Sequence, residues 1–229
     1  MKPVANFNGV ARYYRWLEYA AFGRELERCR FALLPHLAEA QQVLILGEGD
    51  GRFLRRLVKM YPSTRVDVVE SSMRMLQLTR ERLPSEASVH FHPVDARRWR
   101  FPDRKYDAIV SCFFLDCFTP KTLRDLVPRV SASVKPGARW LLAEFADEHT
   151  LRSRVWLAGL YWFFRTATGL ESRQLAPFGE LLSGNEWQRV GSETFAGGLL
   201  RAECWREMFF PRRDVVCGLN KLAKVAAEH

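Results

Sequence analysis

Short runs rich in apolar residues alternate with amphipathic stretches along most of the chain. They predict strands at residues 42–46, 65–69, 89–92, 106–112 and 139–144, and the first of these is a continuous apolar run typical of a strand buried on both faces. The stretches between them predict helices at residues 51–60, 72–83 and 121–134. Alternation of strand and helix is typical of a parallel, doubly wound sheet with right-handed crossovers. The middle of the chain is therefore predicted to be α/β.

The two ends of the chain break this rhythm. Apolar residues three, four and seven apart over residues 11–37 predict a helical N-terminal cap, interrupted near Phe22-Gly23. Residues 192–195 and 199–209 flank the pair Gly197-Gly198, which predicts an antiparallel C-terminal hairpin. Together these elements predict a Rossmann-like, mixed sheet of seven strands. Lys135-Pro136-Gly137 is expected to end the helix that precedes the last parallel strand.

Composition narrows the class of protein. The 229 residues are 48% hydrophobic and 27% charged, as in ordinary globular domains. Five scattered cysteines without a Cys-x-x-Cys pair indicate reduced thiols and argue against a structural metal: Cys29, Cys112, Cys117, Cys204 and Cys217. Residues 1–9 lack the pattern of a secretion signal, and no run approaches the length of a membrane span, so a cytoplasmic location is expected.

The basic balance of the chain bears on its partners. A formal charge of +9 could indicate nucleic acid or a lipid surface. The arginines are dispersed among acids, however, and no nucleic-acid-binding motif accompanies them, so no specific nucleic-acid partner is predicted. A transient contact with a membrane surface stays open.

The first predicted turn carries the strongest chemical signal. Residues 43–54, VLILGEGDGRFL, end a strand in three glycines with an acid between each pair. Glycines in the first turn of a doubly wound sheet let backbone N–H groups approach a ligand. Glu70 follows the next strand, where an acid can accept both hydroxyls of a ribose. A nicotinamide enzyme would use the same device, but its fingerprint asks for glycine where this chain has Arg52, and Glu48 and Asp50 suit a ligand with a cationic portion better.

These motifs together resemble a known family. VLILGEGDG resembles motif I of the class I S-adenosylmethionine-dependent methyltransferases, and VDVVESS resembles their second motif. VHFHPVDARRW, YDAIVSCFFLDCF and VKPGARWLLAEF resemble the third, fourth and strand-five regions in order and spacing. The resemblance is to the small-molecule type, such as the quinone-biosynthesis methyltransferases, and it implies S-adenosylmethionine as the cofactor. The sulfonium and ammonium groups of this cofactor outnumber its one carboxylate, which suits an acidic loop.

The resemblance also implies roles for individual residues. The glycines would face the methionine portion, Glu70 the ribose, and Asp95 and the amide of Ala96 the adenine. Met73 either packs on the adenine or belongs to the core face of its helix. The cofactor-binding set expected on this basis is Gly47, Glu48, Gly49, Gly51, Glu70, Ser71, Met73, Asp95, Ala96 and Ser111.

Methyl transfer is a displacement at carbon, so the protein needs to hold nucleophile, methyl and sulfur in line and to exclude water. Asp116 is the first catalytic candidate, to orient the acceptor or contact the cofactor ammonium; its alternative role is to cap the helix after Thr119-Pro120. His149 is the second, as a base beside the pocket, and its alternative is a surface position. Cys112 and Cys117 lack a nearby histidine and are expected to be structural thiols.

The sequence therefore predicts a single methyltransferase domain over residues 1–229. It divides into a helical cap (1–40), a cofactor-binding core (41–147), a helical substrate-side insertion (148–190), a terminal hairpin (191–210) and a tail (211–229). Aromatic residues in 151–169 favour a hydrophobic or aromatic small-molecule acceptor. The alternatives are a cofactor-binding protein without catalysis, a nucleic-acid methyltransferase and, more remotely, a dehydrogenase. The acceptor, the oligomeric state and the pathway are not encoded in any motif.

Overall fold

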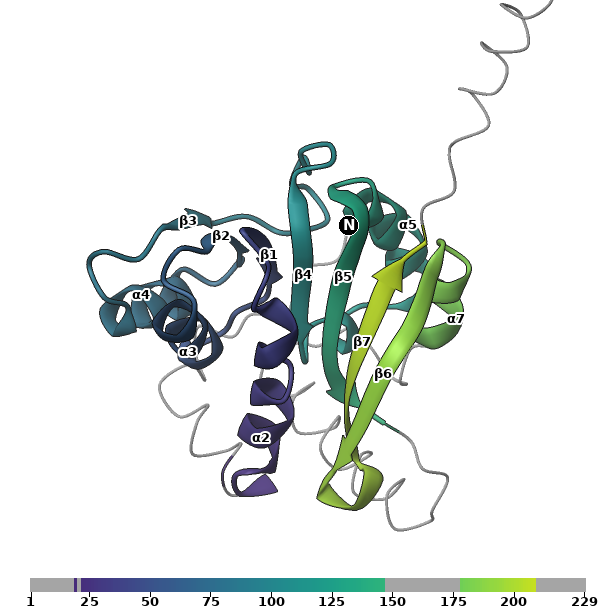
Figure 1. Cartoon of the computed structure of the whole chain (residues 1–229), viewed down its shortest axis with the longest axis horizontal. Helices are drawn as coiled ribbons and strands as arrows, with labels where there is room; N and C mark the ends of the chain where they lie inside the picture. The colour runs from purple at the N-terminus through teal and green to yellow at the C-terminus, as the bar shows by residue number, and fades with distance from the viewer. Residues whose placement is uncertain (1–18, 20–21, 147–177, 209–229) are drawn as a thin grey trace, which may run out of the picture.

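A computed structural model describes Tyr19 and residues 22–146 and 178–208, and these form a seven-stranded α/β structure. The strands lie side by side in the order β3-β2-β1-β4-β5-β7-β6 (Figure 1). The first five pair in parallel, whereas β7 pairs antiparallel with both β5 and β6. The predicted mixed, Rossmann-like sheet with an antiparallel hairpin is confirmed.

The parallel half follows the apolar pattern closely. Its strands are β1 (Gln42–Leu46), β2 (Arg65–Val69), β3 (Val89–His92) and β4 (Tyr106–Cys112). The crossover helices are α3 (Arg52–Met60), α4 (Met73–Arg82) and α5 (Pro120–Ser131), and a single 3-10 turn, η3 (Leu115–Cys117), precedes α5. Before the sheet, α2 (Glu25–Phe31) and η2 (Leu34–Leu37) follow Gly23, whose φ is +58°, at the predicted interruption of the cap.

Two strands of the sheet begin earlier than predicted. Strand β5 (Val134–Phe145) already includes Lys135-Pro136-Gly137, because the chain bulges there: Tyr106 of β4 pairs with Val134, and Ala108 pairs with Arg139. Strand β6 (Trp187–Phe195) begins five residues before the predicted start. A 3-10 turn, η4 (Ala196–Gly198), joins it to β7 (Leu200–Glu207), and the helix α7 (Phe178–Ser183) precedes β6.

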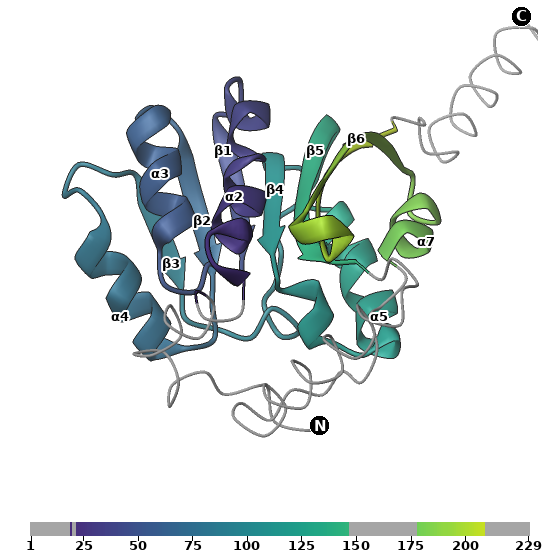
Figure 2. The same ribbon diagram turned by 90° about the horizontal axis from the view of Figure 1, so that it is seen from below.

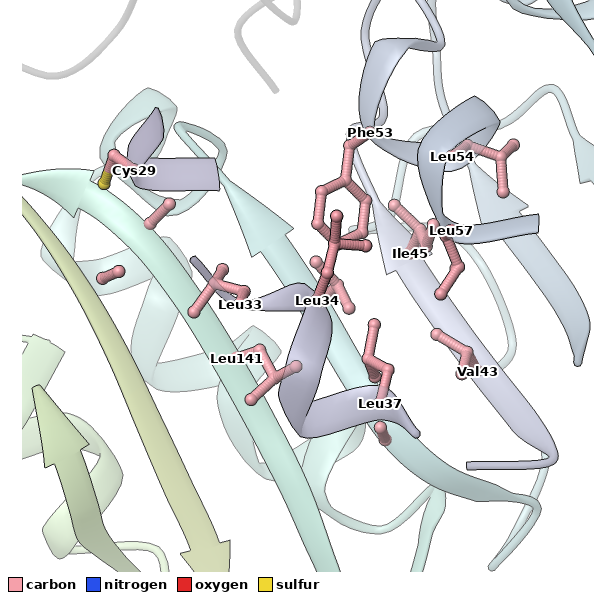
Figure 3. Close-up of a cluster of buried hydrophobic side chains, with 14 of the residues drawn as sticks. Cys29, Leu33, Leu34, Leu37, Val43, Ile45, Phe53, Leu54, Leu57 and Leu141 are labelled. Carbon is pink, nitrogen blue, oxygen red and sulfur yellow. The ribbon is translucent and has the colours of Figure 1, made fainter. Parts of the chain in front are cut away.

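The core lies on both faces of the sheet. One cluster joins residues of α2, η2 and α3 to alternate residues of the central strands, and Figure 3 shows Leu33, Leu34 and Leu37 together with Val43 and Leu141 in it. The other cluster joins α5 and α7 to the opposite face, around the fully buried Trp140. Figure 2 shows α3 beside β1 and β2, and α5 and α7 at the β5–β6 end of the sheet. Helices therefore pack against both faces of the sheet.

The predicted division of the chain into segments is not tested by these elements and stays a prediction. The aromatic stretch 151–169 and the tail 211–229 lie outside the described residues, as does the part of the cap before Tyr19. Within the described part, no helix is both long and apolar enough to cross a membrane.

Candidate functional site

A pocket opens where β1, β2 and β4 end, which is the ligand position of a doubly wound sheet. Its volume is about 980 Å³, including the space that opens to solvent. The lining residues come from α2, from the loops after β1, β2, β3 and β4, and from the first turns of α3 and α4. They are Arg30, Ile45, Gly47, Glu48, Gly49, Asp50, Arg52, Phe53, Glu70, Ser71, Met75, Arg97, Cys112, Phe113, Phe114, Cys117 and Phe118.

The three glycines of the first loop have different roles. All three have positive φ, at +68°, +70° and +86°. A Cβ on Gly47 would lie 2.2 Å from the ring of Phe114, and one on Gly51 would lie 2.7 Å from Cα of Thr79 in α4. A Cβ on Gly49 would meet no atom within 4 Å. Gly47 and Gly51 thus allow close packing, and Gly49 leaves bare backbone facing open space, as a bound cofactor requires.

The two acids of this loop differ in charge. Asp50 forms ion pairs with Arg52 at 2.9 Å and with Arg82 at 2.6 Å. Burial opposes its charge, but these two arginines hold its pKa below the ordinary value. Asp50 lines the pocket, but its charge is compensated by these two arginines of the protein itself.

Glu48, the other acid of this loop, also lines the pocket but forms no ion pair with a described residue. Its Oε1 accepts a hydrogen bond from the amide of Leu54 at 2.9 Å, which satisfies an amide in the first turn of α3. Burial raises the pKa of Glu48 to about 8, helped by the neighbouring carboxylates Asp50 and Glu70 and opposed by Arg30. The carboxyl is thus protonated near neutral pH until a cation approaches it.

Glu70 lies where the sequence predicts it, at the end of β2 and in the lining of the pocket. Its Oε1 accepts from the amide of Ser72 at 2.7 Å, and its Oε2 from the amide of Gly49 at 3.4 Å. Burial raises its pKa, and these amide hydrogen bonds oppose the rise. Glu70 therefore bridges the glycine loop and the β2–α4 turn and lines the same pocket as Gly49.

Of the remaining expected residues, Ser71 lines the pocket and the others do not. The carboxylate of Asp95 accepts from the amide of Arg97 at 2.9 Å and from its Nε at 2.8 Å, and Arg97 is the residue that lines the pocket. Ala96 is buried beside them. Ser111 is also buried, and its Oγ accepts from Nε1 of Trp140 at 3.0 Å. The proposed contacts of Asp95 and Ala96 with adenine stay predictions.

Met73 does not lie in the core of its helix. It is 58% exposed, so that alternative is wrong. Met75, two residues on, is buried and lines the pocket. Residues two apart lie about 200° apart around a helix, so only one of the two methionines can face the pocket.

One wall of the pocket is aromatic and follows β4. Phe113, Phe114 and Phe118 line it together with the thiols Cys112 and Cys117. Phe113 has a φ of +53°, a left-handed conformation that costs a bulky residue about 1–3 kcal/mol. The guanidinium carbon of Arg30, on α2, lies 4.9 Å from the centre of its ring. Burial raises the pKa of both thiols well above the ordinary value, which disfavours a thiolate nucleophile.

The structure describes only one of the two catalytic candidates. Asp116 is buried within η3 and does not line the pocket, and burial raises its pKa to about 6. Its alternative role as a helix cap is wrong, because Oγ1 of Thr119 accepts from the amide of Thr122 and caps α5. His149 lies outside the described residues.

Sequence reasoning missed Arg30, Phe53, Met75 and Arg97 as lining residues. Phe53, Met75 and Arg97 each lie within a few residues of a recognised motif, so the motif spacing could have marked them as candidates. No local signal marks Arg30, because only the packing of α2 on the sheet brings it to the pocket. Among the described residues, no group of three histidine, cysteine or acidic side chains is placed to hold a metal ion.

The fold, the glycine loop and the acid after β2 are those expected of a class I S-adenosylmethionine-dependent methyltransferase, and comparison with known proteins supports this. Residues 43–137 match the family model described as "Methyltransferase domain". This match supports the assignment made from the motifs, a methyltransferase with S-adenosylmethionine as cofactor.

Individual relatives are distant. A protein of Ilyobacter polytropus named malonyl-[acyl-carrier protein] O-methyltransferase 2 is 24% identical over 147 residues, or 64% of this chain and 55% of the relative. The chain thus spans about half the length of that relative. Mitomycin 7-O-methyltransferase MmcR is similar in structure, with a TM-score of 0.66 and 17% identity over 88% of this chain and 60% of that one. Human N-acetylserotonin methyltransferase, solved with S-adenosylmethionine, has a TM-score of 0.61 and 17% identity over 84% and 58% of the two chains.

Proposed function

We propose that the protein transfers the methyl group of S-adenosylmethionine to a small hydrophobic or aromatic acceptor by direct in-line displacement. The observation that carries this proposal is the pairing of Gly49 and Glu70: bare backbone and a carboxyl that line one pocket beyond β1 and β2. When bound, the cofactor supplies a methyl group on a sulfonium, and an acceptor nucleophile displaces the sulfur. The chain then has to bind, align and keep water out.

The residues of the pocket suit the charges of the cofactor. Glu48 would bind the ammonium group, and Arg30, which lines the same pocket and lowers the pKa of Glu48, would face the carboxylate. Glu70 would accept the ribose hydroxyls, as the resemblance implies. A carboxyl and a guanidinium side by side complement the zwitterionic amino-acid end of the cofactor.

The aromatic wall supports the acceptor class. Phe113, Phe114 and Phe118 offer apolar surface, and no histidine is among the described residues that line the pocket. Two of the similar proteins are named as O-methyltransferases, acting on malonyl-[acyl-carrier protein] and on mitomycin. Acceptors with an oxygen nucleophile, a carboxylate or a phenol, are therefore the first class to screen. An acceptor that is already ionised in water needs no base from the protein.

Binding and turnover test the proposal separately. Calorimetry with S-adenosylhomocysteine should show binding to the wild type, and Glu70→Ala should weaken it about 10- to 100-fold, because the variant loses a charge-assisted hydrogen bond to the ligand. Glu81→Ala on the exposed face of α4 is the matched control and should bind normally. Normal binding by Glu70→Ala would contradict the assignment.

Turnover separates an enzyme from a cofactor-binding protein without catalysis. Incubation with S-adenosylmethionine and a panel of aromatic carboxylates, phenols and acyl thioesters should yield S-adenosylhomocysteine with at least one acceptor. Binding without turnover on any member of the panel would favour the non-catalytic alternative.

A further inference from the structure

A buried carboxyl group that the proposed reaction does not use lies behind the aromatic wall. Glu144, near the end of β5, is 5% exposed and does not line the pocket. Its Oε1 accepts hydrogen bonds from two consecutive amides, those of Phe114 at 3.2 Å and Leu115 at 3.0 Å. Its Oε2 is buried with no hydrogen-bond partner among the described residues. A polar atom so placed needs a reason, because burial without a partner is costly.

The backbone of the wall forms a receptor for that carboxyl. Phe113 is left-handed and Phe114 lies in the right-handed region, so the following amides point to one side and form a concave, anion-binding nest. The amide of Phe113 itself donates to the carbonyl of Ala143 at 2.7 Å. Three hydrogen bonds therefore tie residues 113–115 to the end of β5, two of them through the Glu144 side chain.

The same carboxyl faces a second acid. Asp116 follows directly in η3, and burial together with the charge of Asp116 raises the pKa of Glu144. The thiol of Cys117 donates to Oδ1 of Asp116 at 3.6 Å and contacts the carbonyl of Phe113 at 3.8 Å. Cys29 and Cys112 also lie close enough for the Glu144 charge to raise the pKa of their thiols. The wall thus rests on a buried group of acids and thiols that is organised around Glu144.

We propose that Glu144 is a positioning residue, whose carboxyl in the amide nest fixes the aromatic wall of Phe113, Phe114 and Phe118, against which the acceptor binds. The proposal rests on the proposed function only in that the ligand at the wall is taken to be the methyl acceptor. It explains why an acid remains at this buried place and how Phe113 stays in a strained conformation that faces the pocket. It also gives Asp116 a role behind the wall rather than at the reacting atoms.

Native-state hydrogen exchange by NMR tests the hydrogen bonds directly. In Glu144→Ala the amides of Phe114 and Leu115 should exchange roughly 3- to 10-fold faster, which is the range expected for loss of a hydrogen bond to an uncharged acceptor. The amide of Val110, in the middle of β4, should change far less, which separates a local release from general loss of stability. Glu144→Gln keeps an acceptor oxygen at the same reach and should restore slow exchange.

Alkylation of Cys117 reports the position of the wall from the pocket side. N-ethylmaleimide, with peptide mapping, should modify Cys117 about tenfold faster in Glu144→Ala than in the wild type. In Glu144→Gln it should modify Cys117 at the wild-type rate. Glu203→Ala is the matched control: a largely buried carboxylate on the neighbouring strand β7, paired with Arg189 and not with the wall. It should leave labelling at Cys117 unchanged.

The exchange and labelling results either support or overturn the proposed role of Glu144. Unchanged exchange at Phe114 and Leu115 and unchanged labelling in Glu144→Ala would overturn the proposal, as would equal effects in Glu203→Ala. If Glu144→Ala does not fold, Glu144→Asp takes its place, because the shorter side chain cannot reach both amides and should release them. Calorimetry with S-adenosylhomocysteine on the wild type and Glu144→Gln distinguishes the two proposals: absence of binding contradicts the proposed function, and the wall measurements stand without it.

Discussion

Cofactor binding should release a proton from Glu48. Burial raises the pKa of this carboxyl to about 8 in the free protein, so at pH 7 about nine molecules in ten carry the proton. An ammonium group at hydrogen-bond distance favours the ionised form and returns the pKa toward its ordinary range. The bound protein should then hold Glu48 as a carboxylate, with release of about 0.9 proton per cofactor at pH 7.

The same linkage sets the affinity. Because the pKa lies about one unit above pH 7, deprotonation subtracts about 1.4 kcal/mol from binding at that pH. Binding should therefore tighten as the pH rises and level off above about pH 8, by about tenfold in total from pH 7. The sign is fixed by the raised pKa: a carboxyl with its ordinary pKa would be ionised throughout and would give no such dependence.

Calorimetry with S-adenosylhomocysteine in phosphate, Hepes and Tris at pH 7 measures this proton, because the heat of binding then varies with the ionisation enthalpy of the buffer. Glu48→Gln keeps an oxygen for the amide of Leu54 but has no proton to release, so its heat should not vary with the buffer. Glu81→Gln, exposed on α4, should behave as the wild type. A wild-type heat that is independent of buffer, or a Glu48→Gln variant that still releases a proton, would refute the assignment of Glu48 to the ammonium group.

Two further predictions concern the loop and the sheet. Gly49→Ala places its Cβ in open space, so it should fold and lose only about 1–2 kcal/mol of unfolding free energy because of its positive φ, yet it should bind S-adenosylhomocysteine poorly. Gly51→Ala drives a Cβ against Thr79, so its urea midpoint should fall several times more than that of Gly49→Ala. Equal stability losses in the two variants would contradict the separate roles of these glycines. Asp67 is paired with Lys105, and its pKa is lowered despite burial, so Asp67→Asn should cost about 1–3 kcal/mol at pH 7. That cost should vanish as the pH falls through the lowered folded pKa, and a constant difference in urea unfolding down to pH 3 would contradict it.

The parallel half of the sheet could be predicted because its signals are local. Strand β1 is buried on both faces and gives an unbroken apolar run, and β1, β2, β3 and β4 begin and end where the sequence predicts them. Strand β6 has no such run: it is an edge strand, and it exposes Gln188, Arg189 and Val190 in succession next to a bulge. Its first half therefore has neither the apolar run nor the alternation that predicts a strand.

The sequence predicts those site residues whose role depends on their position along the backbone. It does not predict those whose role depends on side chains that are distant in the sequence. Gly49 and Glu70 follow from their positions after β1 and β2. Asp50 has the same acidic character as Glu48 in sequence, but Arg82, which lies 32 residues away, neutralises it. Arg30 likewise reaches the pocket only through the packing of α2 on the sheet. The sequence motif alone therefore overestimates the negative charge that the loop presents to a ligand.

The packing of two loops joins the proposed roles of cofactor and acceptor. The ring of Phe114 occupies the space that a side chain at Gly47 would need, so the wall and the glycine loop interlock. The amide of Phe114 is in turn held by Glu144. A shift of Glu144 would therefore pass through Phe114 to the loop that surrounds the cofactor, without any direct contact between Glu144 and the pocket. Because in-line displacement tolerates little misalignment, one rigid connection from β5 to β1 is a physical means of keeping acceptor and methyl donor in register.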